Sequence, residues 1–296
     1  MSRLLDPKTL MAIKDLSLVA KTTVDGFMSG MHNSRVKGPG LEFSQYRSYQ
    51  AGDDLRWLDW KMYAWSDRYY IRESEIETSI SVRFLVDASR SMNHKDGGNT
   101  KMEYARWLCA SLAWLANLQG DSIGLYVFQE GQVFSMPSRK DIQHLARFYH
   151  QLENIQPAGK FGDPIQYKTI FAGAQKRELL IFVTDYYEQH GEISKLLDTL
   201  HALGHEIILF HIMGRNEIDF DFGNYSSLKD LETGDVIPIN TDLDKADYQK
   251  KLQDHFDRTR MQLLDKHIVY RLLIMDELPD KALRDFLNQR QKTATG

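Results

Sequence analysis

Short apolar runs rich in β-branched and aromatic residues alternate with segments of helical periodicity from about Ser79 onward. Parallel strands must be joined by a crossover, and a helix is its usual form. Helices on both faces of such a sheet also explain why the runs are almost wholly apolar. The pattern therefore predicts an α/β fold with a doubly wound, mostly parallel sheet of Rossmann type. Strands are expected at 79–87, 122–129, 177–185 and 205–213, and helices at 101–118, 141–152 and 193–202.

The pattern continues after two departures. "QVFSM" (132–136) follows Glu130-Gly131, which predicts an antiparallel partner for the strand before it. "YSSLKDLETGDVIPIN" (225–240) predicts a small β-hairpin inside an insertion at about 215–242. We expect the main domain to span residues 78–291. Its last elements are expected to be a helix at 246–264, a strand at 267–275 and a helix at 281–290.

The first 77 residues lack this regularity. Asp6-Pro7 is a good helix start, and the periodic run after it reaches about Ala20. Residues 34–77 are dense in aromatic and charged side chains without a long period, which predicts short strands and turns, one of them a strand at Tyr69–Arg72. We expect residues 1–77 to form a helical and β clasp packed on the main domain.

Clustered acids within this clasp favour a structural interpretation over a catalytic one. Gly-Asp-Asp before an aromatic run is typical of a turn followed by a helix cap. The acids are Asp53, Asp54 and Asp59, their expected partners are Arg47, Arg56 and Arg72, and the expected packing anchors are Trp57 and Trp60.

Composition excludes several classes of function. The net charge of −4 over 296 residues offers no nucleic-acid surface. Cys109 is the only cysteine, so an intramolecular disulfide is excluded and a reducing compartment is indicated. No apolar run reaches the roughly 18 residues that cross a bilayer, and the first residues lack a signal-peptide core. We therefore expect a cytoplasmic protein without membrane insertion. No phosphate-binding glycine motif is present, so nucleotide hydrolysis is not expected.

Polar residues follow two of the predicted strands. Asp87, Ser89 and Ser91 come one residue apart where the strand at 79–87 ends, and Asp185 ends a later strand. Ligands of open α/β sheets bind at this carboxyl edge. Two carboxylates and two hydroxyls are hard oxygen donors that suit Mg²⁺ or Mn²⁺. The alternative is a serine-rich turn that caps the helix beginning near Thr100.

These residues carry a family resemblance. "LVDASRSM" (85–92), followed by a helix and a later "VTD" (183–185), resembles the von Willebrand factor A domain and its metal-ion-dependent adhesion site. The upstream "QYRSYQAGDDLRWLDW" (45–60) and the tail with "DLETGD" (230–235) are similar to the bacterial family called domain of unknown function 58. The resemblance extends from about Ser34 to Arg290. Members are typically encoded beside MoxR-type AAA+ ATPases, which implies such an ATPase, or its client, as the partner.

The resemblance also implies a set of metal ligands. By position, Asp87, Ser89 and Ser91 match the first motif of the adhesion site, and Asp185 matches the last. The middle motif usually supplies a threonine, but "AGKFGDP" (158–164) has Gly162 there, followed by Asp163. Either Asp163 or a water is expected to take the place of the threonine hydroxyl, or the affinity of the site for the cation is expected to be low.

The function favoured by these residues is a non-enzymatic, metal-dependent protein-interaction module. A coordinated cation with one open position would accept a carboxylate from the partner. One alternative is a metal-assisted hydrolase that uses the Asp87 and Asp185 cluster, with Asp163 or His94 as its general base. The other alternative is a scaffold without metal.

Overall fold

The protein divides into two compact units, which are described separately. One unit comprises residues 1–27 and 79–296, and the other comprises residues 28–78. The structure is a computed structural model that describes residues 7–11, 13, 15–33, 45–50, 58–73, 79–167, 177–223, 227–238 and 241–295.

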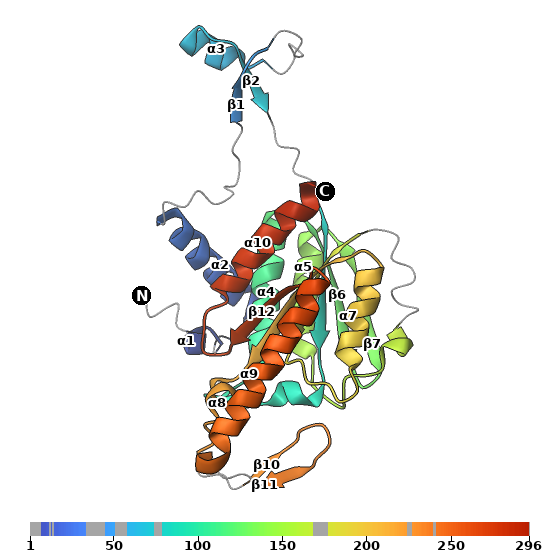
Figure 1. The fold of residues 1–296 in the computed structure, drawn as a ribbon. Helices are drawn as coiled ribbons and strands as arrows, with labels where there is room; N and C mark the ends of the chain where they lie inside the picture. Colours follow the sequence, from blue (N-terminus) through green and yellow to red (C-terminus); the bar gives the residue numbers. More distant parts are fainter. Residues whose placement is uncertain are drawn as a thin grey trace. The chain divides into compact units, whose positions relative to one another are not determined.

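A six-stranded sheet forms the centre of the larger unit (Figure 1). Its order is β12-β9-β8-β3-β6-β7, and every neighbouring pair is parallel except β6 and β7. The sheet grows in one direction from β3 to β6 and β7, and in the other from β8 to β9 and β12. This is the doubly wound order, with its switch point between β3 and β8. The predicted α/β class with a doubly wound, mostly parallel sheet is confirmed. The strands are β3 (Ser81–Asp87), β6 (Ser122–Gln129), β7 (Gln132–Arg139), β8 (Leu179–Thr184), β9 (Glu206–Met213) and β12 (Val269–Ile274).

Helices cover both faces of this sheet (Figure 1). On β3, Phe84 packs edge-on against Phe148 of α5, with ring centroids 5.1 Å apart. Its neighbour Leu85 lies in a separate buried cluster with Ile193 and Leu197 of α7. Successive strand residues thus enter cores on opposite faces. One face carries α4 (Lys101–Leu118), α5 (Ile142–Asn154) and α10 (Asp280–Thr295), and the other carries α7 (Glu192–Ala202) and α9 (Thr241–Asp265).

The N-terminal run forms two helices rather than the single one predicted. They are α1 (Pro7–Met11) and α2 (Leu16–Asn33). The carboxylate of Asp15 accepts a hydrogen bond from the amide of Leu18 at 3.0 Å, so an acid begins the second helix. Thr23 of α2 accepts a 2.8 Å hydrogen bond from the buried indole of Trp107, so this part of the chain belongs to the main core.

The smaller unit contains one helix that the sequence did not predict. β1 (Gln45–Ser48) pairs antiparallel with β2 (Tyr70–Glu73), close to the strand predicted at Tyr69–Arg72. Between them, α3 (Trp60–Ser66) begins at Asp59, whose carboxylate accepts the amides of Lys61 and Met62. The capping interpretation of this acid is therefore correct. A seven-residue helix with no buried residue leaves no apolar period to detect.

Trp60 lies in the smaller unit, and its expected role as a packing anchor stays a prediction. It begins α3 and is 63% exposed, whereas Tyr63 and Tyr69 stack with centroids 4.5 Å apart. Packing of residues 1–77 on the main domain stays a prediction. Asp53, Asp54, Arg56 and Trp57 lie outside the described residues, as do the side chains of Arg47 and Arg72.

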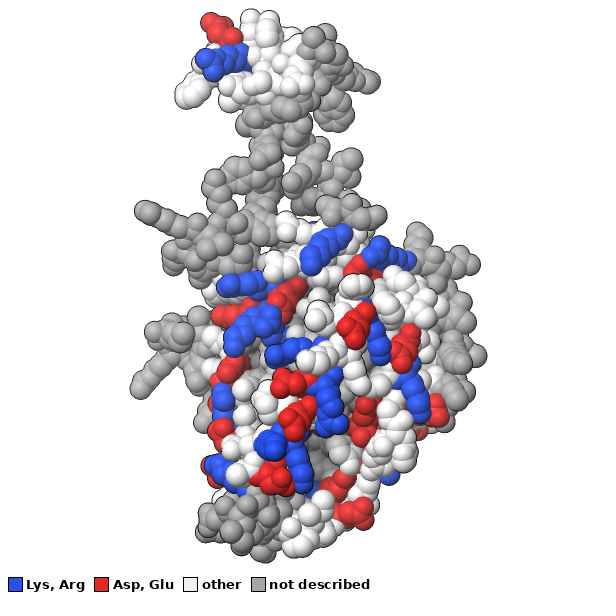
Figure 2. All heavy atoms as spheres, viewed as in Figure 1, with Lys and Arg blue, Asp and Glu red and all other residues white. Residues whose placement is uncertain are grey.

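The hairpin predicted at 225–240 is present in the larger unit. It consists of β10 (Ser227–Lys229) and β11 (Val236–Pro238), paired antiparallel, and α8 (Arg215–Asp219) precedes it. Two short strands, β4 (Lys95–Asp96) and β5 (Asn99–Thr100), pair beside the start of α4. Among the described helices, none combines the length and apolar character needed to cross a bilayer. Figure 2 shows basic and acidic side chains intermixed along α9, so charge of one sign does not gather on that face.

Candidate functional site

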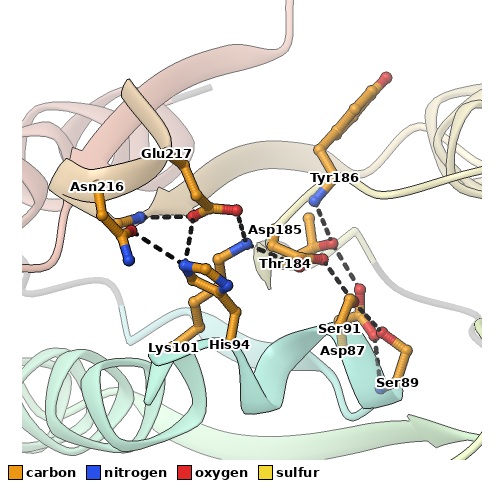
Figure 3. A network of polar contacts seen from close by, with 11 residues as sticks. Asp87, Ser89, Ser91, His94, Lys101, Thr184, Asp185, Tyr186, Asn216 and Glu217 are labelled. Atoms are coloured by element: carbon orange, nitrogen blue, oxygen red, sulfur yellow. Dashed lines mark hydrogen bonds and ion pairs between the residues drawn. The ribbon is translucent and has the colours of Figure 1, made fainter. Parts of the chain in front are cut away.

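The switch point of the sheet brings the predicted polar residues together. β3 ends at Asp87, its parallel neighbour β8 ends at Thr184, and Asp185 follows directly. Parallel strands end at the same edge, so the segments that leave β3 and β8 lie side by side there. Ser89 and Ser91 return to this edge because a short 3-10 helix, η3 (Arg90–Asn93), turns the chain just after β3. Figure 3 shows the resulting cluster.

A chain of hydrogen bonds joins the four side chains. The backbone amide of Ser89 donates to Asp87 Oδ1 at 2.9 Å. The hydroxyls of Ser89 and Ser91 lie 3.0 Å apart, and Ser91 Oγ donates to Asp185 Oδ1 at 3.0 Å. All four residues are buried. The structure therefore unites Asp87, Ser89, Ser91 and Asp185, as their strand-edge placement predicted.

The capping alternative does not account for these serines. Thr100 itself caps α4, in a capping box with Glu103. Ser89 precedes η3, but its side chain makes no capping hydrogen bond. Both serine hydroxyls thus face the acids and each other rather than a helix end.

Thr184 joins this cluster as a residue that sequence reasoning missed. Its hydroxyl donates to Asp87 Oδ2 at 2.6 Å and accepts from the amide of Tyr186 at 2.9 Å. Burial and the charge of Asp185 raise the pKa of Asp87 to about 6, although the Thr184 and Ser89 hydrogen bonds oppose the shift. The threonine of the "VTD" run is the feature of the sequence that could have identified Thr184 as a member of the cluster.

Lys101 is a second missed residue, and it neutralises part of the cluster. Its ammonium lies 3.1 Å from Asp185 Oδ2 and 2.8 Å from Glu217 Oε1, with its side chain 5% exposed (Figure 3). Burial favours the neutral amine, but the two carboxylates outweigh it and raise the pKa of Lys101. Within the described ranges, Asp87 has no comparable ion pair.

His94 does not face the two acids as a general base would. Its Nε2 lies 3.0 Å from Asn216 Oδ1 and 3.7 Å from Glu217 Oε2. Both contacts hold the ring on the α8 side of Lys101 (Figure 3). His94 is therefore engaged by groups outside the Asp87 and Asp185 pair.

Gly162 is explained by a tyrosine that the sequence interpretation overlooked. A Cβ at Gly162 would lie 2.2 Å from the hydroxyl oxygen of Tyr167 and 2.7 Å from Gly131 Cα. The phenol of Tyr167 therefore occupies the space that a side chain at position 162 would need. Asp163, by contrast, is exposed. Its role as a metal ligand stays a prediction.

The Tyr167 hydroxyl is buried, and the charge of Asp87 acts on it. Tyr167 is 1% exposed, and its ring packs against Phe128 and Phe161. Burial raises the pKa of Tyr167 to about 12, and the charges of Asp87 and Asp163 add to the shift. The nearby backbone of Gly162 lowers the pKa of Tyr167. Its contact with the hydroxyl does not have the geometry of a hydrogen bond, so the hydroxyl has no partner. A buried hydroxyl beside Asp87 is thus left unsatisfied.

A third carboxylate, in the turn of the β10–β11 hairpin, is subject to the charges of these two acids. Burial and the charges of Asp87 and Asp185 raise the pKa of Glu232 to about 7, while the hydroxyls of Ser89 and Ser91 lower it. Its Oε1 is buried without a hydrogen-bond partner. Such an acid beside two others is costly unless a proton or a cation accompanies it.

These donors fit a small divalent cation. All are oxygens, and two of them, Tyr167 Oη and Glu232 Oε1, are buried without a partner. Over the part of the chain that the structure describes, no three His, Cys, Asp or Glu side chains lie close enough to form a metal cluster by themselves. A cation here would therefore depend on Asp87 and Asp185 together with hydroxyls and water, as Mg²⁺ sites commonly do.

Comparison with known proteins finds relatives without an assigned activity. Uncharacterised proteins of Mycobacterium bovis and Mycobacterium tuberculosis are each 24% identical over 242 residues, which cover 80% of this chain and 75% of theirs.

Among solved structures, the conserved hypothetical protein BatB of Bacteroides thetaiotaomicron aligns with a TM-score of 0.49 and 19% identity, over 74% of this chain and all of that one. An aerotolerance-related membrane protein of Bacteroides fragilis aligns with a TM-score of 0.48 and 16% identity, over 71% of this chain and all of that one.

The family profile described as "Protein of unknown function DUF58" matches residues 45–258. This match covers well over half of the chain and includes the β3 and β8 ends and the hairpin. The chain belongs to the DUF58 family.

Proposed function

We propose that this protein is a non-enzymatic interaction module in which Mg²⁺ or Mn²⁺ binds a carboxylate of a partner protein. Asp87, Ser89 and Ser91 hold the cation directly or through water, and Asp185 orients a coordinated water. The Tyr167 hydroxyl supplies the oxygen that the family resemblance assigns to a threonine. The bound cation contributes a positive charge with an exchangeable position, which an acidic partner side chain fills.

The buried, unpartnered hydroxyl of Tyr167 is the observation that carries this proposal. A neutral hydroxyl left unsatisfied in the core costs about 1–3 kcal/mol. The hydroxyl is subject to the charge of Asp87 and occupies the space that a side chain at Gly162 would need. A bound cation would give this unpartnered oxygen a ligand contact and so offset the cost of burying it. Family membership and the doubly wound fold support the interaction role.

The proposed partner is a MoxR-type AAA+ ATPase or a client that it remodels, in the cytoplasm. This follows from the family resemblance. The hydrolase alternative is disfavoured, because His94 is bonded to Asn216 and Asp163 is exposed. The contacts of His94 with Asn216 and Glu217 leave it poorly placed to take a proton from a nucleophile held between Asp87 and Asp185.

Calorimetry with Mg²⁺ and Mn²⁺ tests the cation, and a binding assay with the purified cognate ATPase tests the partner. Asp87→Asn keeps the shape of the side chain and removes its charge, so it should abolish cation binding without unfolding the protein. Complex formation should weaken in EDTA and in this variant. Asp198→Asn, at an exposed acid of α7, is the control and should behave as wild type. Equal complex formation in EDTA and in Asp87→Asn, or turnover of a substrate by the protein alone, contradicts the proposal.

A further inference from the structure

The two edges of the main sheet differ in how they are protected against pairing with another chain. Natural sheets protect an edge strand with prolines, lysines and irregularities of register. β7, at one edge, contains Pro137, which has no amide to donate, and its register with β6 shifts between Ile123 and Leu125. β12, at the other edge, runs from Val269 to Ile274 in unbroken parallel register with β9 and contains neither proline nor lysine. The β12 edge therefore lacks the protection that the β7 edge has.

Alternate residues of β12 direct their backbone groups away from the sheet. The amide of Met275, just after β12, donates to the carbonyl of Met213 at the end of β9 at 3.0 Å. In a parallel pair, every second residue of a strand bonds to the neighbouring strand. The N–H and C=O groups of the intervening residues therefore point outward; these residues are Tyr270, Leu272 and Ile274. Among these groups, and within the described residues, only the C=O of Ile274 has a backbone partner, the amide of Glu277 at 2.9 Å.

The ring contacts of α9 show which flank of this helix lies on the β12 side. His255 packs against Tyr186, which follows β8, with ring centroids 6.2 Å apart. Phe256 packs against His211 of β9, with ring centroids 5.7 Å apart. One residue turns an α-helix by about 100°. The turn from His255 to Phe256 therefore runs from the β8 side to β9, and the surface that follows in the same direction lies toward β12.

Two large apolar side chains lie on this flank of α9. Leu264 lies about 80° further around the helix than Phe256, and Met261 lies about one turn before Leu264. Each of these two side chains is 68% exposed. α9 itself packs against β12 (Figure 1). The unprotected strand edge and the exposed apolar pair are thus neighbouring parts of one surface.

We infer that this surface is the contact between two copies of the chain. β12 of one copy pairs antiparallel with β12 of the other around a two-fold axis at Leu272, so that the two sheets become continuous. The outward groups of one strand then meet the outward groups of the other. Leu272 faces its own equivalent, and Tyr270 faces Ile274. The same axis places the two α9 helices side by side on one face of the joined sheet, where Met261 and Leu264 are covered.

The side chains at this edge favour a second copy as the occupant. In this register the ring of Tyr270 meets the β-branched Ile274, which is a favourable cross-strand pair. Arg271 faces Leu273 of the other copy rather than a second arginine, and Asp285 already pairs with it at 2.7 Å. Basic and acidic side chains are intermixed along α9 (Figure 2), so charge of one sign does not gather there to repel a second copy. The surface is therefore compatible with itself, as a two-fold contact requires.

The two-fold axis has a consequence for the polar cluster. It reverses the strand direction between the copies, so the carboxyl ends of β3 and β8 face opposite ways in the two halves of the dimer. Each dimer then presents Asp87 and Asp185 at two opposite ends and can contact two partner molecules at once. The contact itself does not depend on whether these acids bind a cation.

Sedimentation velocity at concentrations from about 1 to 100 μM tests the contact, since dilution dissociates a dimer of micromolar affinity. Wild type should change from monomer to dimer across this range. Met261→Lys combined with Leu264→Lys places like charges on both sides of the contact and should raise the dissociation constant of the dimer about tenfold or more. Ile142→Lys is the matched control, because Ile142 is 65% exposed at the start of α5, and should behave as wild type.

Hydrogen exchange tests the strand pairing without any substitution. The outward amides of Tyr270, Leu272 and Ile274 should exchange slowly at the highest concentration and rapidly at the lowest. The amide of Leu273 points toward β9 and should be protected at both concentrations. This alternation along one strand distinguishes edge pairing from a general change in the stability of the protein.

A dimer that the two lysines weaken and Ile142→Lys does not, with outward amides whose protection rises with concentration, supports the inference. Wild type that stays monomeric up to about 100 μM overturns it and leaves the edge free or open to a strand of a different protein. A dimer that keeps its affinity in the double lysine variant, or whose outward amides exchange rapidly at every concentration, uses another surface and also overturns it.

Discussion

Replacing Tyr167 by phenylalanine should stabilise the cation-free protein and weaken cation binding. The ring contacts with Phe128 and Phe161 remain, and only the hydroxyl is lost. That hydroxyl is buried, lacks a hydrogen-bond partner and lies near the charge of Asp87. In EDTA it is a desolvated polar group without compensation, whereas with a cation it becomes a ligand. Tyr167→Phe should therefore raise the stability of the cation-free protein and lower the stabilisation that a bound cation provides.

The expected change in the free energy of unfolding can be estimated for the cation-free and for the cation-bound protein. Removing an unsatisfied buried hydroxyl recovers up to about 1–3 kcal/mol, and the small void left behind offsets part of this gain. A net gain of about 1 kcal/mol in EDTA is expected. At a cation concentration of about 100 times the dissociation constant, binding stabilises wild type by about 2.7 kcal/mol. A tenfold loss of affinity reduces that term to about 1.4 kcal/mol in the variant. The advantage of the variant should then disappear in saturating Mg²⁺.

Urea denaturation in EDTA and in Mg²⁺, with calorimetry of Mg²⁺ binding, measures both effects. Tyr149→Phe is a matched control, because the Tyr149 hydroxyl is also buried without a partner but lies on α5. It should stabilise the protein in both conditions and leave Mg²⁺ affinity unchanged. Destabilisation by Tyr167→Phe in EDTA would show that the hydroxyl has a partner within the protein. Unchanged Mg²⁺ affinity would remove Tyr167 from the site.

Four further outcomes follow from the same contacts. Gly162→Ala should lower the free energy of unfolding, measured in urea, by about 1–3 kcal/mol, because its Cβ meets the Tyr167 oxygen and the Gly131 backbone. Adding Tyr167→Phe should recover part of this loss. If the effects of the two substitutions on stability are simply additive, the clash is contradicted. Mg²⁺ affinity should fall about tenfold per pH unit below the Asp87 pKa of about 6, since the carboxyl must lose its proton to bind. In EDTA, the pKa of Asp87 in the folded protein, about 6, lies above its unfolded value of 3.8. The contribution of Asp87 to stability is therefore full below pH 3.8 and is lost as the pH rises through about 6. Asp87→Asn should abolish this dependence in denaturation measured between pH 4 and pH 8. Lys101→Met should reduce the free energy of unfolding by about 3–5 kcal/mol in EDTA, because two carboxylates lose their buried ammonium. Mg²⁺ should reduce this loss of stability. An equal loss with and without Mg²⁺ would show that Lys101 does not act on the cation site.

Sequence patterns predicted the elements whose local signal was strong. The helix Lys101–Leu118 and the strand Ser122–Gln129 have the predicted bounds, because each carries an uninterrupted period bounded by clear end signals. Asp87 and Asp185 were identified for a similar reason. The ends of buried strands can be located from composition, and adjacent parallel strands bring their ends to one edge. α3 was missed because no residue in it is buried.

The remaining site residues carry no local signal of their role. Lys101 begins a helix, where a lysine usually faces solvent, and only the packing of β8 and α8 around it reveals two carboxylates. The Tyr167 hydroxyl lies in the space that a side chain at Gly162, five positions earlier, would need, because the chain turns back through a 3-10 helix at Pro164–Tyr167. Glu232 lies 47 residues beyond Asp185 in a hairpin turn. Spacing along the chain cannot identify such pairs, since they depend on how the connections fold back on the sheet.

The distribution of the acids gives the site a consequence beyond affinity. Asp87, Asp185 and Glu232 belong to three segments: the end of β3, the segment after β8 and the turn of the hairpin. Without a cation, the raised pKa values of Asp87 and Glu232 show that each of these two carboxylates is disfavoured as an anion by burial and by its neighbours. Under the proposed function, a carboxylate completes the shell of the cation whichever acidic partner supplies it. The free energy that distinguishes one partner from another then depends on the contacts made outside the cation, so specificity should reside in the surface around the exposed Arg90 and Lys160 rather than in the cation site itself.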